Sequence, residues 1–169
     1  MTKDLILIGM PGCGKSTIGK RLAQRLNLPF LDLDAEIEEL AGMPIPAIFE
    51  QEGEDGFRQW ETKAFLQAVG KGRIIATGGG IVTRQENLLI AKQGWVVFLD
   101  RPLAAIMNDV RTDTRPLLKE GKDRLIRLHQ ERDGLYRFWA DSTVVNDGKI
   151  EDVIERIIKE VNGYETYGD

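Results

Sequence analysis

The stretch GMPGCGKST, at Gly9–Thr17, limits the possible folds more than any other part of the sequence. It follows a short apolar run, Asp4–Gly9, that is typical of a buried strand, and it leads into a helical pattern from Lys15 to about Asn27. Its glycines, lysine and serine fit G-x-x-x-x-G-K-[ST], the pattern of a phosphate-binding loop between a strand and a helix. A chance glycine turn before a lysine would not need that strand and helix. The sequence therefore predicts that this loop binds a nucleoside triphosphate.

The residue types in this loop suit the chemistry of a triphosphate. Glycines allow backbone N–H groups to curl around phosphate oxygens, and the helix that begins near Lys15 directs its positive dipole end at the same anion. Lys15 can reach the β- and γ-phosphates, and the Ser16 hydroxyl can bind Mg²⁺. Cys13 is either a thiol activated by the helix N-terminus or, as we favour, a small residue that fits the loop. The expected nucleotide contacts are Gly12, Cys13, Gly14, Lys15, Ser16 and Thr17.

Short apolar runs alternate with helical patterns along the rest of the chain. Strands are expected at 29–34, 73–77, 95–99 and 142–146. Helices are expected at 84–93, 102–110, 123–140 and 150–161, and helical pieces fill 35–70 with breaks near 42–46 and 52–56. We expect the last residues, 162–169, to be a frayed tail. Nearly all-apolar strands between helices predict a three-layer α/β/α fold with a five-stranded parallel sheet.

Ligands of such sheets bind beyond the carboxyl ends of the strands. The phosphate-binding loop follows the first expected strand, Asp32 and Asp34 end the second, and Gly78–Gly80 follow the third. These three features therefore share one edge of the sheet, and we expect them to form a single site.

The composition argues against several other classes of protein. The 169 residues suffice for one domain with its own core, and 42% hydrophobic with 30% charged residues is typical of a globular protein. The net charge of −4 argues against a nucleic-acid surface, and no apolar run approaches the roughly 18 residues of a membrane span. One cysteine cannot form an internal disulfide, which fits a reducing cytoplasm.

Six motifs together resemble one family of small-molecule kinases. GMPGCGKST, LDLD, IFEQEGEDGFRQWE, ATGGG, RPLL and ERDGLY occur in the order and spacing of shikimate kinases, from Gly9 to about Asp141. The resemblance implies a P-loop kinase fold in a single domain over 1–169, with a mobile lid at about 110–122 and a shikimate-binding helical region at about 34–62. It also implies ATP-dependent phosphorylation of the shikimate 3-hydroxyl, with Mg²⁺, in chorismate and aromatic amino-acid biosynthesis. We expect a cytoplasmic monomer whose partners are ATP and shikimate, without nucleic acid or membrane.

The two aspartates of LDLD have different roles by this resemblance. Asp32 supports Mg²⁺, usually through water, together with Ser16, while Asp34 holds the acceptor hydroxyl and is a candidate for taking its proton. Capping of the following helix is the alternative for Asp34. Asp100 ends an apolar strand as a Walker-B carboxylate would, but we favour an N-cap of the next helix there.

Arginines are assigned to the carboxylate of shikimate by the same resemblance. Arg58 suits it because a guanidinium binds a carboxylate in a planar, bidentate geometry, and Glu61 can hold Arg58 as its i,i+3 partner. Arg132 is a second clamp. Gly134 stands where the family pattern R-x-P-L-Y has proline, and we expect a more flexible break in the helix there. Arg137 is the competing assignment, with no motif to support it.

The remaining substrate contacts come from glycines and aromatic residues. The resemblance assigns Gly78, Gly79 and Gly80 to the ring hydroxyls of shikimate, with Gly79 donating from its backbone. Phe49 and Phe57 either line the ring pocket or belong to the core.

Two arginines of the lid are assigned to the nucleotide. Arg115 would neutralise charge at the γ-phosphate and so counts, with Lys15 and Asp34, as catalytic, and Arg111 would lie against adenine. After the fifth strand the family pattern is absent, so that Asn146 and Lys149 are the polar groups available to adenine.

Two other functions remain open from the residues. A related kinase for gluconate or a nucleoside monophosphate would share the loop and the lid, but would not need LDLD, GFRQWE and GGG together. A nucleotide-binding module without turnover would keep the fold. The intact Lys15, Ser16, Asp34, Arg58 and Arg115 argue against it.

Overall fold

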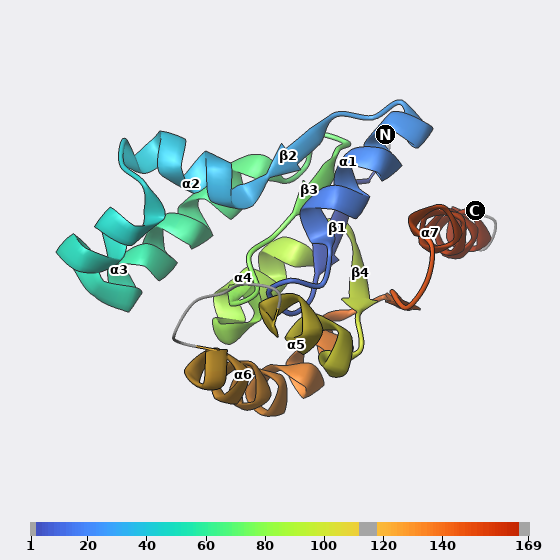
Figure 1. Ribbon diagram of the computed structural model, residues 1–169. Helices are drawn as coiled ribbons and strands as arrows, with labels where there is room; N and C mark the ends of the chain where they lie inside the picture. The colour runs from blue at the N-terminus through green and yellow to red at the C-terminus, as the bar shows by residue number, and fades with distance from the viewer. Residues whose placement is uncertain (1–2, 112–117, 166–169) are drawn as a thin grey trace.

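The computed structural model describes residues 3–111 and 118–165 (Figure 1). Its strands are β1 (Leu5–Ile8), β2 (Phe30–Asp32), β3 (Ile74–Ala76), β4 (Trp95–Asp100) and β5 (Ser142–Val145). Its helices are α1 (Lys15–Leu26), α2 (Leu33–Ala41), α3 (Ile45–Ala68), α4 (Gln85–Ala91), α5 (Leu103–Arg111), α6 (Leu118–Trp139) and α7 (Ile150–Glu165). A 3₁₀ turn, η1 (Ile81–Thr83), precedes α4.

The five strands form one parallel sheet in the order β2-β3-β1-β4-β5. Ile6 of the central strand lies beside Ile75 of β3 and Val96 of β4, and all three are buried. Helices α1 and α7 pack together on one side of the sheet, while α4 and α6 lie on the other (Figure 1). The all-apolar strands are therefore covered on both faces, which confirms the predicted three-layer α/β fold.

The strand order determines what lies beside what at the carboxyl edge. Because β3 lies between β2 and β1, the Gly78–Gly80 turn that follows β3 lies between the aspartates after β2 and the loop after β1. The first turn of α2 and the start of α1 meet the same edge. The sheet topology thus brings the predicted site residues together, as the sequence indicates.

Helices α2 and α3 form a pair beside the β2 edge (Figure 1). Within α3 the helix bends at Gly53, whose φ of 71° and ψ of −174° are accessible essentially only to glycine. The predicted breaks near 42–46 and 52–56 are confirmed by the end of α2 and by this bend. Arg58 therefore lies early in a helical segment, as expected.

Three local predictions differ from the structure. The second strand ends at Asp32, and Asp34 already belongs to α2, because the Asp32 side chain caps that helix. Gly134 does not break α6, since one glycine costs a helix only about 1 kcal/mol. Helix α7 continues to Glu165, so that the first residues of the expected tail are helical. Residues 112–117 of the expected lid lie outside the described residues.

No helix in the ranges that the structure describes is long and apolar enough to cross a membrane.

The bend at Gly53 leads to a prediction about stability. Gly53→Ala should lower the free energy of unfolding by about 1–3 kcal/mol, because alanine must adopt a strained backbone conformation at a place where its Cβ has open space. Gly134→Ala is the matched control, since its Cβ also has open space but the backbone there is helical. That variant should gain about 0.5–1 kcal/mol. Urea unfolding of both variants measures the difference, and equal effects would contradict it.

Candidate active site

The phosphate-binding loop joins β1 to α1, as predicted. Gly14 is the N-cap of α1 with a φ of 98°, a left-handed conformation that glycine adopts without strain. It has no side chain to cap the helix, and the first N–H groups of a helix have no acceptor within it. The start of α1, at Lys15, Ser16 and Thr17, is therefore suited to bind an anion.

The Lys15 side chain lies along the inside of this loop. Its Nζ donates to the carbonyl oxygens of Gly9 at 2.8 Å and Met10 at 2.9 Å, and it lies 3.6 Å from Sγ of Cys13. Lys15 and Cys13 are both buried. A fully buried thiol is typical of a structural cysteine, which favours the interpretation of Cys13 as a small residue that fits the loop.

Ser16 and Asp32 form a pair of oxygen groups at the start of α1. The Ser16 hydroxyl donates to Oδ2 of Asp32 at 2.9 Å, while Oδ1 of Asp32 accepts from the backbone N–H of Asp34 at 3.0 Å. The cap of α2 is therefore Asp32, and the alternative that Asp34 caps this helix is wrong. A hydroxyl beside a carboxylate fits Mg²⁺, which usually takes one or two protein oxygens together with phosphate oxygens and water.

Asp34 projects from the first turn of α2 and is exposed to the site. Desolvation by the protein around its carboxyl group raises the pKa of Asp34 above the usual 3.8, and the charge of Asp32 raises it further, while Lys15 opposes both. A Cβ added at Gly78 would lie 3.2 Å from Oδ1 of Asp34 and 3.1 Å from Oε2 of Glu61. Gly78 therefore packs against two carboxylates.

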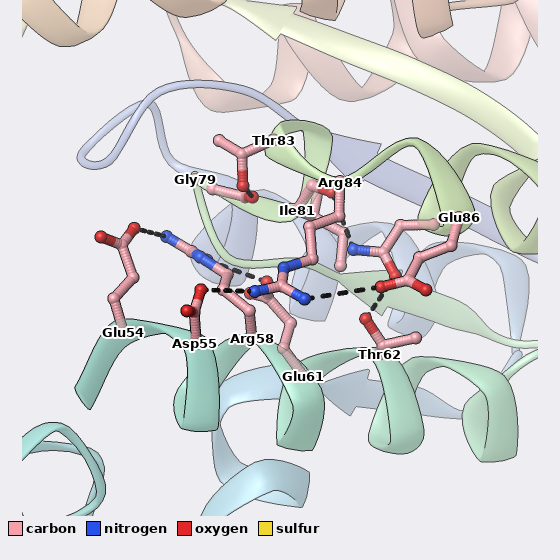
Figure 2. A network of polar contacts seen from close by, with 12 residues as sticks. Glu54, Asp55, Arg58, Glu61, Thr62, Gly79, Ile81, Thr83, Arg84 and Glu86 are labelled. Carbon is pink, nitrogen blue, oxygen red and sulfur yellow. Dashed lines mark hydrogen bonds and ion pairs between the residues drawn. The ribbon is translucent and has the colours of Figure 1, made fainter. Parts of the chain in front are cut away.

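Arg58 and Glu61 form a buried ion pair on α3 (Figure 2). Nη1 of Arg58 donates to Oε1 of Glu61 at 2.8 Å, which confirms the predicted i,i+3 partnership. Burial raises the pKa of Glu61, against the lowering effect of Arg58. Nε of Arg58 and Oε2 of Glu61 are buried without a hydrogen-bond partner among the described residues. Such atoms are costly, and a bound ligand or water that satisfies them is one explanation.

Two further contacts surround the Arg58 guanidinium. Exposed Glu54 lies 3.5 Å from its Nη2, on the turn before it (Figure 2). The ring of Phe57 lies 5.1 Å from its Cζ and stacks on Phe49 with centroids 4.6 Å apart. Phe57 is buried and Phe49 is half exposed, so that the pair reaches from the core to the surface beside Arg58.

The Gly78–Gly80 turn contacts a different partner through each glycine. A Cβ at Gly79 would lie 2.7 Å from Cδ of Pro11 in the phosphate-binding loop, and one at Gly80 would lie 2.6 Å from Cζ of Arg58. Since neither could be accommodated without movement, these glycines are needed for close packing. The three consecutive glycines that the sequence singled out therefore have a structural cause.

Helix α6 carries a second arginine, Arg132, whose charge lowers the pKa of Glu61 and of Tyr136 against the effect of burial. Arg132 is partly buried, and its Nε has no hydrogen-bond partner among the described residues. One helical turn later, the Tyr136 hydroxyl donates to the carbonyl oxygen of Gly79 at 2.5 Å. The sequence does not predict this contact, although Tyr136 ends the ERDGLY motif.

Arg137 and Asp100 pair with each other outside this site. Nη2 of Arg137 donates to Oδ2 of Asp100 at 2.9 Å, and its Nε donates to Asp133 at 2.9 Å. The prediction that Asp100 caps the next helix is wrong, because α5 begins only at Leu103 and the Asp100 carboxylate is bound to Arg137. Arg137 already has two carboxylates, which favours Arg132 as the arginine of the site.

On its other side, the phosphate-binding loop borders a cavity of about 350 Å³. Asn146 lines it and donates from Nδ2 to the carbonyl oxygen of Cys13 at 2.8 Å, whereas Lys149 does not line it. Arg101, which no motif pointed to, lines it as well and donates to the carbonyl oxygen of Gly12 at 2.8 Å. The side chain of Arg111 and all of Arg115 lie outside the described residues.

Comparisons with known proteins agree on one family. The family model for shikimate kinase matches residues 11–162. A shikimate kinase of Clostridium beijerinckii is 44% identical over 95% of this chain and 95% of its own, and one of Neisseria meningitidis serogroup C is 42% identical over 94% and 95%. A solved shikimate kinase from Acinetobacter baumannii, in complex with shikimate, has a TM-score of 0.86 and 36% identity over 97% of this chain and 95% of that chain.

A gluconokinase from Sinorhizobium meliloti is more distant. It covers 96% of this chain with a TM-score of 0.58, but only 13% of the residues are identical. Its likeness extends to the fold alone.

The contact between Gly80 and Arg58 leads to a prediction. Gly80→Ala should destabilise the protein by about 1–3 kcal/mol, because the added methyl group overlaps the guanidinium of a buried ion pair. Gly80 has a φ of −95°, so that backbone strain does not contribute. Gly148→Ala, whose Cβ meets open space, is the control and should change stability little. Thermal unfolding distinguishes the two, and a Gly80→Ala variant as stable as the parent would contradict the contact.

Proposed function

The chain belongs to the shikimate kinase family, and we propose that it transfers the γ-phosphoryl group of ATP to the 3-hydroxyl of shikimate. The products are shikimate 3-phosphate and ADP, in chorismate and aromatic amino-acid biosynthesis. One observation carries the residue-level proposal. Arg58 and Arg132, whose Nε atoms are buried and have no hydrogen-bond partner in the part of the chain that the structure describes, lie at the same sheet edge as the phosphate-binding loop and Asp34.

The acceptor is held through its carboxylate. A guanidinium binds a carboxylate through two parallel hydrogen bonds, and Arg58 is held on one side by Glu61. Arg132 approaches the same turn from α6. The stacked rings of Phe49 and Phe57 offer an apolar surface beside Arg58 for the carbon ring of the substrate. Gly78, Gly79 and Gly80 would bind the ring hydroxyls, with Gly79 donating through its backbone N–H.

Asp34 holds the hydroxyl that is phosphorylated. Its carboxylate accepts the hydrogen bond from that hydroxyl and directs the oxygen at the γ-phosphorus. As the new P–O bond forms and the bond to ADP breaks, the hydroxyl proton passes to Asp34. The raised pKa of Asp34 favours this transfer relative to an ordinary aspartate.

The phosphate-binding loop holds the nucleotide. The helix start at Gly14–Thr17 and the amine of Lys15 stabilise the negative charge of the phosphates. Ser16 and Asp32 would hold Mg²⁺, directly or through water, and the metal would supply positive charge to the phosphates. The cavity beside Gly14, with Asn146 and Arg101, would accept the adenosine part.

Some parts of the proposal rest on the sequence alone. Arg115 would bind the γ-phosphate and Arg111 the adenine, within a lid over about 110–122. A cytoplasmic location fits a chain with a single, buried cysteine. We also propose that the protein works as a monomer.

ADP release tests the function directly. Purified protein with Mg²⁺ and ATP should release ADP rapidly when shikimate is added, and should not respond to gluconate or AMP. Stimulation by gluconate or AMP instead would favour a related kinase. ATP binding without any stimulation would favour a module that has lost turnover.

The assignment of Arg132 over Arg137 can be tested by a matched pair of variants. Arg132→Ala should raise the KM for shikimate about tenfold or more, because a charge-assisted contact to the carboxylate is lost, and should leave the KM for ATP nearly unchanged. Arg137→Ala removes an arginine of the same helix that is bound to Asp100 and Asp133, and should change neither constant much. Steady-state kinetics with each substrate varied decides, and the reverse pattern would overturn the assignment.

The role of Asp34 sets the acidic side of the pH profile. Only the carboxylate form accepts the hydroxyl proton, and the pKa of Asp34 is raised above 3.8, so that kcat should fall as the pH falls through a value above 3.8. Asp34→Asn should abolish turnover with ATP affinity preserved. Glu36→Gln, a change in the same turn of α2, is the control and should keep turnover. An Asp34→Asn variant with appreciable turnover, or with lost ATP binding, would contradict the role.

A further inference from the structure

Tyr136 is a buried polar residue that the proposed reaction does not yet use. It is completely buried on α6, and its ring stacks on Phe98 of β4 with centroids 5.2 Å apart and planes 24° apart. Its hydroxyl donates to the carbonyl oxygen of Gly79 at 2.5 Å. The ring is thus held by the sheet, and the hydroxyl is the part that reaches the glycine turn.

The hydrogen bond to the Gly79 carbonyl oxygen fixes the orientation of the whole peptide unit between Gly79 and Gly80. A peptide unit is planar and trans, so that the N–H of Gly80 points to the side opposite the Gly79 carbonyl. On the chain around this unit, Gly79 packs on Pro11 and Gly80 packs on Arg58. A rotation of the unit would therefore disturb both the contact with the phosphate-binding loop and the surroundings of Arg58.

The hydroxyl stays a donor over the whole working range of pH. Burial raises the pKa of Tyr136 to about 12, against the lowering effect of Arg132. Arg132 lies one helical turn before Tyr136 on α6, so that both side chains project from the same face of that helix. The helix thereby delivers a cation and a permanent donor to the same turn.

We propose that Tyr136 is a positioning residue for the acceptor: its hydroxyl, by holding the Gly79 carbonyl, orients the glycine turn that binds the acceptor and keeps this turn in register with the phosphate-binding loop. Tyr136 touches neither substrate in this role and acts through Gly79 and Gly80. The proposal rests on the proposed function, because the glycine turn must be part of the acceptor site.

Tyr136→Phe tests it, since the ring and its stacking on Phe98 are kept and only the hydroxyl is removed. We expect kcat/KM for shikimate to fall about fivefold or more, as the loss of one hydrogen bond implies, and the KM for ATP to stay within about twofold of the parent. Tyr136→4-aminophenylalanine restores an N–H donor at the same place and should recover most of the loss.

Thr62→Val is the matched control. Thr62 donates from its hydroxyl to Oδ1 of Asn87 at 2.8 Å, and no hydrogen bond among the described residues joins Thr62 directly to Gly78–Gly80. This variant should lose stability to a similar extent and keep the kinetics of the parent for both substrates. If the Tyr136 hydroxyl served stability alone, Tyr136→Phe would likewise lose stability and keep the kinetics of the parent.

Each outcome decides the matter. Parent-like kcat/KM for shikimate in Tyr136→Phe, or a rise in the KM for ATP as large as that for shikimate, would overturn the positioning role. If Tyr136→Phe does not fold, 4-aminophenylalanine decides: parent-like kinetics support the role and a loss contradicts it. Failure of the parent itself to use shikimate would count against the proposed function instead, so that the two failures are distinguishable.

Discussion

The close packing of the Gly78–Gly80 turn is the constraint on which the rest of the site depends. Gly78 lies against the carboxylates of Asp34 and Glu61, Gly79 against Pro11, and Gly80 against Arg58. A side chain at Gly79 or Gly80 would overlap its neighbour. Because β3 lies between β1 and β2, this turn is the only element between the donor loop and the acceptor aspartate within the described sheet. Its small size therefore allows the two halves of the site to meet.

This packing explains how an acidic protein holds an anionic substrate. The chain has a net charge of −4, yet Lys15 and Arg58 are buried at one edge of the sheet. Glu61 keeps Arg58 in place, but its own charge is costly there, because burial raises the pKa of Glu61 and disfavours the ionised form. In this ion pair, Nε of Arg58 and Oε2 of Glu61 have no hydrogen-bond partner among the described residues. Such a buried pair is weak evidence for stability and fits a role in binding better. These charges support the proposed binding of one triphosphate and one small carboxylate.

The sequence predicts those parts of the fold and the site whose signal is local. The phosphate-binding motif, the apolar strands and the i,i+3 spacing of Arg58 and Glu61 are read within a few residues, and the structure agrees. The missed contacts join distant parts of the chain. Tyr136 reaches Gly79 and Arg137 reaches Asp100 across 57 and 37 positions. Local patterns also extended the second strand to Asp34, because Asp32 both ends the strand and caps α2.

The account requires that the buried arginines bind the carboxylate of the acceptor. Titration calorimetry of shikimate and of its methyl ester, which has the same ring hydroxyls without the charge, measures this most directly. The account predicts that the ester binds about tenfold more weakly or worse, as the loss of charge-assisted hydrogen bonds implies. Equal affinities for the acid and the ester would contradict it.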